Sequence, residues 1–173
     1  MTAARRRKTS REPQCLPVDR QHPPVDRIVS GGQTGVDRAA LDVALELGIP
    51  CGGWCPRGRK AEDGTIPLRY PLQEADSAAY SQRTVLNVRD SDGTLILVGG
   101  PIRGGTSLTR KTADRLGKPC LVVDVRSAPD CPTVRGWLRD HAIGVLNIAG
   151  SRGSQQPGVK RAATRFLREL FQG

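Results

Sequence analysis

Two glycine-rich turns constrain the fold of this chain more than any other feature. The first, Gly31-Gly32-Gln33-Thr34-Gly35, follows the apolar run 27–30, and the second, at 99–107, follows the apolar run 94–98. A stretch with helical character comes after each turn. A strand, a glycine-rich turn and a helix in succession direct backbone N–H groups and the positive end of the helix dipole at an anion. Two such turns in one chain predict a single site for a phosphate-bearing ligand.

Strands and helices alternate along the rest of the chain. Apolar residues recur at helical spacing from Val36 to Leu47, and Gly48 then predicts the end of that helix. Further helices are expected near 78–90, 105–116, 132–141 and 157–171, and further strands at 120–124 and 144–148. Apolar strands that alternate with helices are typical of a parallel sheet covered on both faces. We therefore predict an α/β, Rossmann-like three-layer sandwich with a mainly parallel sheet.

The charge pattern separates a tail from a single domain. The net charge is +10, but residues 1–27 hold seven basic and three acidic residues, residues 151–173 hold five and one, and residues 28–150 hold fifteen and thirteen. We predict a disordered basic tail over 1–26 and one ligand-binding domain over 27–173. With only six aromatic residues, the chain does not suggest a nucleic-acid-binding protein. No apolar run is long enough for a membrane span or a secretory signal, so we expect a cytoplasmic protein.

The five cysteines favour reduced thiols over a disulfide framework, because their number is odd and their spacing shows no tight pairing. Cys51-x3-Cys55 is half of a zinc pattern without a second pair, so no metal site is expected. No Ser-His-Asp set or other nucleophile–base pair can be assembled around the two histidines, so we assign no catalytic residue. The sequence favours binding over catalysis.

Ligands of open α/β sheets bind beyond the carboxyl ends of the strands, where both turns and the segment 147–152 are expected to lie. The first turn matches neither the dinucleotide nor the P-loop spacing. Trp54 and its neighbouring arginines suit a flat anionic ligand, although a Trp packed on the core beside a solvated loop is the alternative. Asp90 can orient a ring N–H or belong to an ordinary turn. The expected ligand-binding residues are Gly31, Gly32, Gln33, Thr34, Gly35, Trp54, Arg57, Arg59, Asp90, Gly100, Arg103, Gly104, Gly105, Thr106, Ser107 and Asn147.

Several of these segments resemble the family of molybdenum-cofactor (Moco) carrier proteins, within a Rossmann-like superfamily that includes lysine-decarboxylase-like nucleotide phosphoribohydrolases. The resemblance covers about residues 27–171. It is carried by the segments 28–42, 52–59, 61–64, 87–96, 104–106 and 146–150. The resemblance implies a homo-oligomer, dimer or tetramer, that binds molybdopterin-type cofactor, protects it and passes it to Moco-dependent apo-enzymes.

The sequence departs from both patterns at particular positions. The hydrolase relatives carry a glutamate after their Gly-Thr turn, and Thr109 stands at that position here. The carrier pattern has a proline where Ser151 stands and a glutamate where Gly153 stands. A nucleotide or N-glycoside processing enzyme and a nucleotide-sensing module remain the alternatives to a carrier.

Overall fold

A five-stranded parallel sheet forms the centre of the structure, a computed structural model that describes residues 24–127 and 129–173. The strand order is β2-β1-β9-β7-β8, and every neighbouring pair is parallel. The strands of this sheet are β1 (Arg27–Val29), β2 (Cys51–Gly52), β7 (Gly93–Val98), β8 (Cys120–Asp124) and β9 (Val145–Gly150). The last strand of the chain, β9, therefore lies between the first strand and β7. The predicted α/β fold with a mainly parallel sheet is confirmed.

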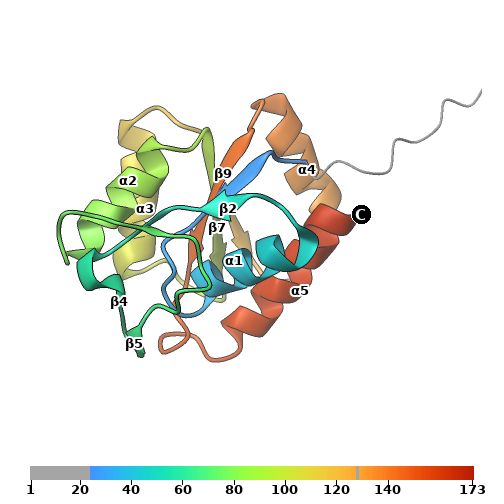
Figure 1. Cartoon of the computed structure of the whole chain (residues 1–173). Helices are drawn as coiled ribbons and strands as arrows, with labels where there is room; N and C mark the ends of the chain where they lie inside the picture. The colour runs from blue at the N-terminus through green and yellow to red at the C-terminus, as the bar shows by residue number, and fades with distance from the viewer. Residues whose placement is uncertain (1–23, 128) are drawn as a thin grey trace, which may run out of the picture.

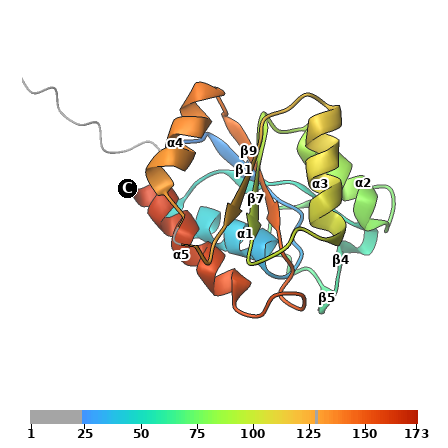
Figure 2. The same cartoon turned by 180° about the vertical axis from the view of Figure 1, so that it is seen from behind.

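Helices cover both faces of this sheet (Figures 1 and 2). The five helices of the described residues are α1 (Val36–Leu47), α2 (Tyr80–Arg89), α3 (Gly104–Arg115), α4 (Cys131–Asp140) and α5 (Val159–Gln172). One face carries α1, α4 and α5, and the other carries α2 and α3. The helix boundaries lie within two residues of those expected from periodicity.

The main hydrophobic core lies between the sheet and the layer of α1, α4 and α5. Small residues on α1, among them Ala40 and Ala44, are fully buried and let this helix pack closely on α5. The α1 helix ends at Gly48, whose φ of 68° is left-handed, as the sequence predicts for a helix stop. On the opposite face, α2 and α3 bury polar side chains as well, namely Arg83, Thr84, Asn87, Thr106, Thr109 and Thr112.

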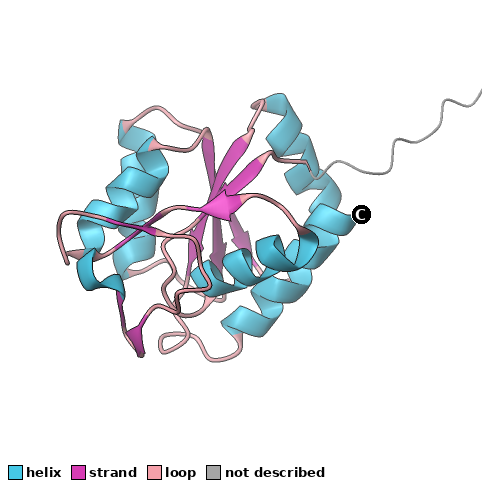
Figure 3. Cartoon of the chain, viewed as in Figure 1, coloured by secondary structure: helices cyan, strands magenta, loops and turns pink. Residues whose placement is uncertain are grey.

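The segment between β2 and α2 is ordered by a second, smaller core. Leu41 of α1 packs with Cys55, Ala61, Ile66 and Tyr70, all of them buried. Figure 3 shows this segment as loops with very short strands. These pieces are β3 (Trp54–Cys55), a 3-10 turn (Arg57–Arg59), β4 (Lys60–Ala61), β5 (Gly64–Thr65) and β6 (Gln73–Glu74). The long loop expected at 49–75 thus folds against α1.

The ordered fold begins before the expected boundary at Arg27. Val25 is buried in the main core, and the backbone N–H of Asp26 donates to the carbonyl oxygen of Gly144 at 2.9 Å. The rest of the expected tail, residues 1–23, lies outside the described residues. Across the described part of the chain, no helix combines the length and apolar content needed to cross a bilayer.

Candidate ligand-binding site

Three loops meet beyond the carboxyl ends of β1, β7 and β9. The side chain of Gln33 comes from the first glycine-rich turn, Gly105 and Thr106 from the second, and Arg152 from the loop after β9. Together they line a narrow space that we call the crevice. Its free volume is only about 20 Å³, room for one water-sized group.

A buried ion pair forms one wall of the crevice. The Arg83 guanidinium donates from Nη1 to Asp37 Oδ2 at 3.0 Å, and both side chains are almost fully buried. Burial raises the pKa of the Asp37 carboxyl above its ordinary value, and the charge of Arg83 only partly opposes this. The Nε of Arg83 is buried and has no hydrogen-bond partner among the described residues. The crevice therefore contains a buried cation with one unused donor.

The first turn is held by hydrogen bonds within the protein. The backbone N–H of Gln33 donates to Asp37 Oδ2, and the side-chain oxygen of Gln33 accepts from the N–H groups of Thr34 and Glu62. The hydroxyl of Thr34 donates to Glu62, which also accepts from the hydroxyl of Ser154 at 2.6 Å. Thr34 therefore does not cap α1, and no side chain does. Several donors of this turn hold the loops together.

Glycine is required in the first turn by close packing. A Cβ at Gly35, whose φ is 85°, would lie 2.3 Å from the carbonyl oxygen of Ser151. A Cβ at Gly32, whose φ is 74°, would lie 2.5 Å from the Leu72 side chain. Both positions therefore bring the turn against neighbouring chain segments, and both need a left-handed backbone that L-residues avoid.

The second turn is open by comparison at the end that leads into α3. The N-terminus of α3 has no side-chain cap and no acidic residue in its first turn. A Cβ at Gly104 or Gly105 would meet nothing within 4 Å. A concave space of about 340 Å³ lies next to this helix end, and we call it the hollow. Its lining residues are Pro101, Arg103, Thr106, Ser151, Gln155 and Gln156. Thr106 and Gln155 also line the crevice, so the two spaces adjoin.

The structure places Trp54 and Asp90 together, at a distance from the crevice. The indole Nε1 donates to Asp90 Oδ2 at 2.8 Å, while Asn87 pairs with the backbone N–H and carbonyl of Trp54. Asp90 follows the last residue of α2 and lies seven residues beyond Arg83, about 10 Å along the helix axis. The hydrogen bond from Arg89 holds the pKa of the Asp90 carboxyl below its ordinary value, with the indole hydrogen bond adding to this against the effect of burial.

Arg59 is engaged by its own loop. Its guanidinium donates to the carbonyl oxygens of Ile66, Leu72, Pro67 and Tyr70 at 2.9–3.2 Å. Arg57 is exposed in the same 3-10 turn and lines neither the crevice nor the hollow.

The remaining expected residues are divided between the sheet and α3. Asn147 is buried in β9, where its amide donates to the Thr94 hydroxyl at 3.2 Å. Ser107 lies in the first turn of α3, half-buried. Gly100 lies on the other side of the second turn, in a separate cleft.

Sequence reasoning did not select Arg83, Asp37, Arg152 or Gln155 as ligand contacts, although all four line the crevice. Arg83 belongs to no recognisable motif, and because an arginine on a helix is ordinarily solvated, the sequence gives no sign that this side chain is buried. Asp37 could be assigned only a helix-dipole role from its place in the first turn of α1. Within residues 24–127 and 129–173, no three His, Cys, Asp or Glu side chains gather as metal ligands would.

A parallel α/β sandwich with helices on both faces of the sheet defines a Rossmann-like protein. The chain belongs to the circularly permutated YpsA SLOG family, whose model matches residues 28–171. It is also similar to a solved structure named "Putative molybdenum carrier protein" from Syntrophus aciditrophicus SB. The two sequences are 46% identical, the TM-score is 0.82, and the match covers 87% of this chain and 97% of the other. The expected family resemblance is confirmed. No curated protein matches the chain significantly.

Proposed function

We propose that this protein binds molybdenum cofactor in the hollow, protects it and passes it to Moco-dependent apo-enzymes. The observation that carries the proposal is the uncapped N-terminus of α3, whose residues Arg103 and Thr106 line the hollow. Backbone donors, a cation and a hydroxyl together suit the phosphate of the cofactor. The name of the Syntrophus relative supports molybdenum cofactor as the cargo.

The size of the hollow supports a ligand of this kind. Its volume of about 340 Å³ falls in the range of small-molecule sites, about 300–1,000 Å³. The adjoining crevice adds the buried Arg83 cation and the partly buried Arg152. A tricyclic pterin with its phosphate combines a flat body with anionic groups, which matches a polar hollow with cations on two sides.

Thr109 supports binding rather than hydrolysis. It lines the crevice at the position of the hydrolase glutamate, and its hydroxyl donates to the carbonyl oxygen of Gly105 at 2.9 Å. A hydroxyl that is already donating to the backbone offers no carboxylate for acid–base chemistry.

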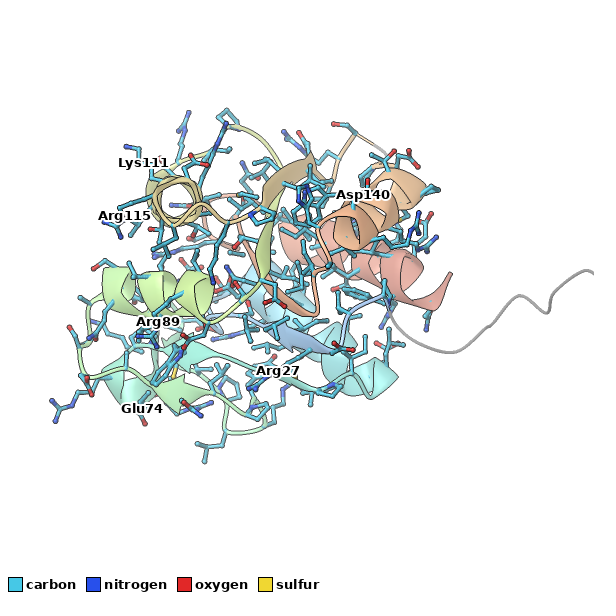
Figure 4. The ribbon with its side chains drawn as sticks, turned by 90° about the horizontal axis from the view of Figure 1, so that it is seen from above. Arg27, Glu74, Arg89, Lys111, Arg115 and Asp140 are labelled. Atoms are coloured by element: carbon cyan, nitrogen blue, oxygen red, sulfur yellow. The ribbon has the colours of Figure 1, made fainter. Side chains whose placement is uncertain are left out.

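Charge reversal at the hollow tests the function. Arg103→Glu should weaken anaerobic binding of molybdopterin cofactor about tenfold or more, because it replaces a cation with an anion beside the phosphate. Arg115→Glu is the matched control, since Arg115 lies on the exposed side of the same helix at its other end (Figure 4). Equal affinity of both variants and the unchanged protein would contradict the proposal, as would failure of the loaded protein to activate a cofactor-free nitrate reductase.

We also propose a homo-oligomer, dimer or tetramer, in the cytoplasm. Support for assembly comes from β8, an edge strand of the central sheet whose five residues, Cys120–Asp124, are all half-buried. An apolar edge strand offers backbone groups for pairing with a second copy. The mass of the purified full-length protein in solution checks this, and a monomeric mass would contradict it.

A further inference from the structure

A second cavity lies beside the hollow, on the other side of the second glycine-rich turn. It has a volume of about 690 Å³, and we call it the basic cleft. It shares Pro101, Gln155 and Gln156 with the hollow, so the two spaces adjoin. Its walls are the turn from Gly99 to Pro101, the loop after β8 and the start of α5.

Three arginines from two separate parts of the chain give this cleft its charge. Arg126 follows β8, while Arg161 and Arg165 lie one turn apart on α5. Among the described residues, Arg126 has a carboxylate partner, Asp124 at 3.6 Å, and Arg161 and Arg165 have none. The α5 helix begins after Gly158 with no side-chain cap and no acidic residue in its first turn. The cleft is therefore suited to an anionic group.

Gln156 adds a requirement that an anion does not meet. Its side-chain amide lies against the second turn, where a Cβ at Gly99 would be 2.6 Å from Oε1 and a Cβ at Gly100 would be 2.7 Å from Nε2. The Oε1 atom is buried and has no hydrogen-bond partner among the described residues. A buried amide oxygen needs an N–H or O–H donor. A phosphate dianion offers no such donor, whereas a nucleoside has ribose hydroxyls and base amines.

We propose that the basic cleft binds the nucleotide part of a dinucleotide form of the cofactor, in which a pyrophosphate joins the pterin to a nucleoside. This inference rests on the proposed function and specifies which form of the cofactor binds. The pterin end occupies the hollow, and the pyrophosphate crosses beside Pro101 and Gln156, which line both spaces. The nucleoside then lies between Gln156 and the arginines of α5, whose planar guanidinium groups can stack on a base.

Calorimetric titration of the full chain under anaerobic conditions tests the proposal. The probes are molybdopterin cofactor, its guanine dinucleotide form, and GMP alone. The dinucleotide form should bind about tenfold or more tightly than the monophosphate form, because only it reaches both cavities. GMP alone should bind weakly, since it lacks the pterin end.

A double variant separates the cleft from the hollow, and a variant at Gln156 tests the buried amide. Arg161→Gln/Arg165→Gln should reduce the affinity for the dinucleotide form to that for the monophosphate form and leave the latter unchanged. The matched control is Arg115→Gln/Arg139→Gln, which removes the same charge from exposed residues in the last turns of α3 and α4. Gln156→Leu should also weaken dinucleotide binding about tenfold without lowering the melting temperature, because Oε1 has no partner to lose in the free protein.

The remaining outcomes of the titrations contradict either this inference alone or the proposed function as well. Equal affinity of the unchanged protein for both cofactor forms overturns this inference alone, as does equal loss of both forms in the Arg161/Arg165 variant. Tight GMP binding without any gain for the dinucleotide form also overturns it, because the cleft would then be a site for free nucleotides. If neither cofactor form binds, the proposed function fails and this inference fails with it.

Discussion

The guanidinium of Arg83 occupies the space that a side chain at position 31 would fill. A Cβ at Gly31 would lie 1.6 Å from Arg83 Nη1 and 2.9 Å from Asp37 Oδ2. The absence of a side chain in the first turn therefore makes room for the buried ion pair beside the crevice. Gly31, which the sequence analysis assigned to ligand binding, instead leaves room for the guanidinium of Arg83.

Gly31→Ala should destabilise the fold by displacing Arg83. Breaking a buried ion pair by moving one partner costs about 3–5 kcal/mol, and the free energy of unfolding in urea measures the loss. Gly136→Ala is the control, because a Cβ in that helix meets only one atom, at 3.9 Å. In an Arg83→Met background, Gly31→Ala should lower the free energy of unfolding by less than it does in the unchanged protein. An equal loss in both backgrounds would show that the new side chain does not collide with Arg83.

Asp37→Asn should change how stability depends on pH. The pKa of Asp37 is raised in the folded state by burial, so the folded protein holds this proton more tightly than the unfolded chain does. Its contribution to stability is therefore fully present below the ordinary value of 3.8 and is lost as the pH rises through the folded-state pKa. The unfolding free energy of the unchanged protein minus that of the variant should fall over this window. A difference that rises with pH would mean that ionised Asp37 stabilises the fold.

The fold was predictable because its signals are local, whereas part of the site depends on distant contacts. The spacing of Val36, Val43 and Leu47 identifies α1 without knowledge of any other segment. The burial of Arg83 depends on Asp37, 46 residues away, and on the missing side chain at Gly31. A glycine-rich turn also looks the same in sequence whether its donors are free or already bonded. The hydrogen bonds of Gln33 and Glu62 decide that question for the first turn.

Arg59→Lys should loosen the segment around residues 66–72 and leave cofactor affinity within about twofold. A lysine ammonium cannot reach the four carbonyl oxygens to which the planar guanidinium donates. Amide hydrogen exchange of Ile66, Tyr70 and Leu72 should accelerate about tenfold, equivalent to about 1.4 kcal/mol. A loss of affinity with unchanged exchange would instead indicate that Arg59 contacts the ligand.

Asp90→Asn should shift the fluorescence of Trp54 without weakening cofactor binding by more than about twofold. The carboxylate accepts the indole N–H, and the pair lies about 10 Å along α2 from Arg83. The experiment uses a Trp137→Phe background, because Trp137 is the other tryptophan of the chain. A tenfold loss of affinity in this variant would restore the interpretation in which Trp54 and Asp90 hold the pterin.

The two glycine-rich turns should respond differently to the same substitution. Gly105→Val places its side chain in open space at the start of α3, where Gly105 lines the crevice that adjoins the hollow. It should therefore obstruct the ligand at this helix end while changing the melting temperature by no more than Gly136→Val does. Gly32→Val should lower stability by a few kcal/mol, about 1–3 for the left-handed backbone alone, and it also collides with Leu72. Cofactor titration and thermal unfolding of the three variants are compared at the same pH. If Gly105→Val binds cofactor normally, the N-terminus of α3 does not hold the ligand.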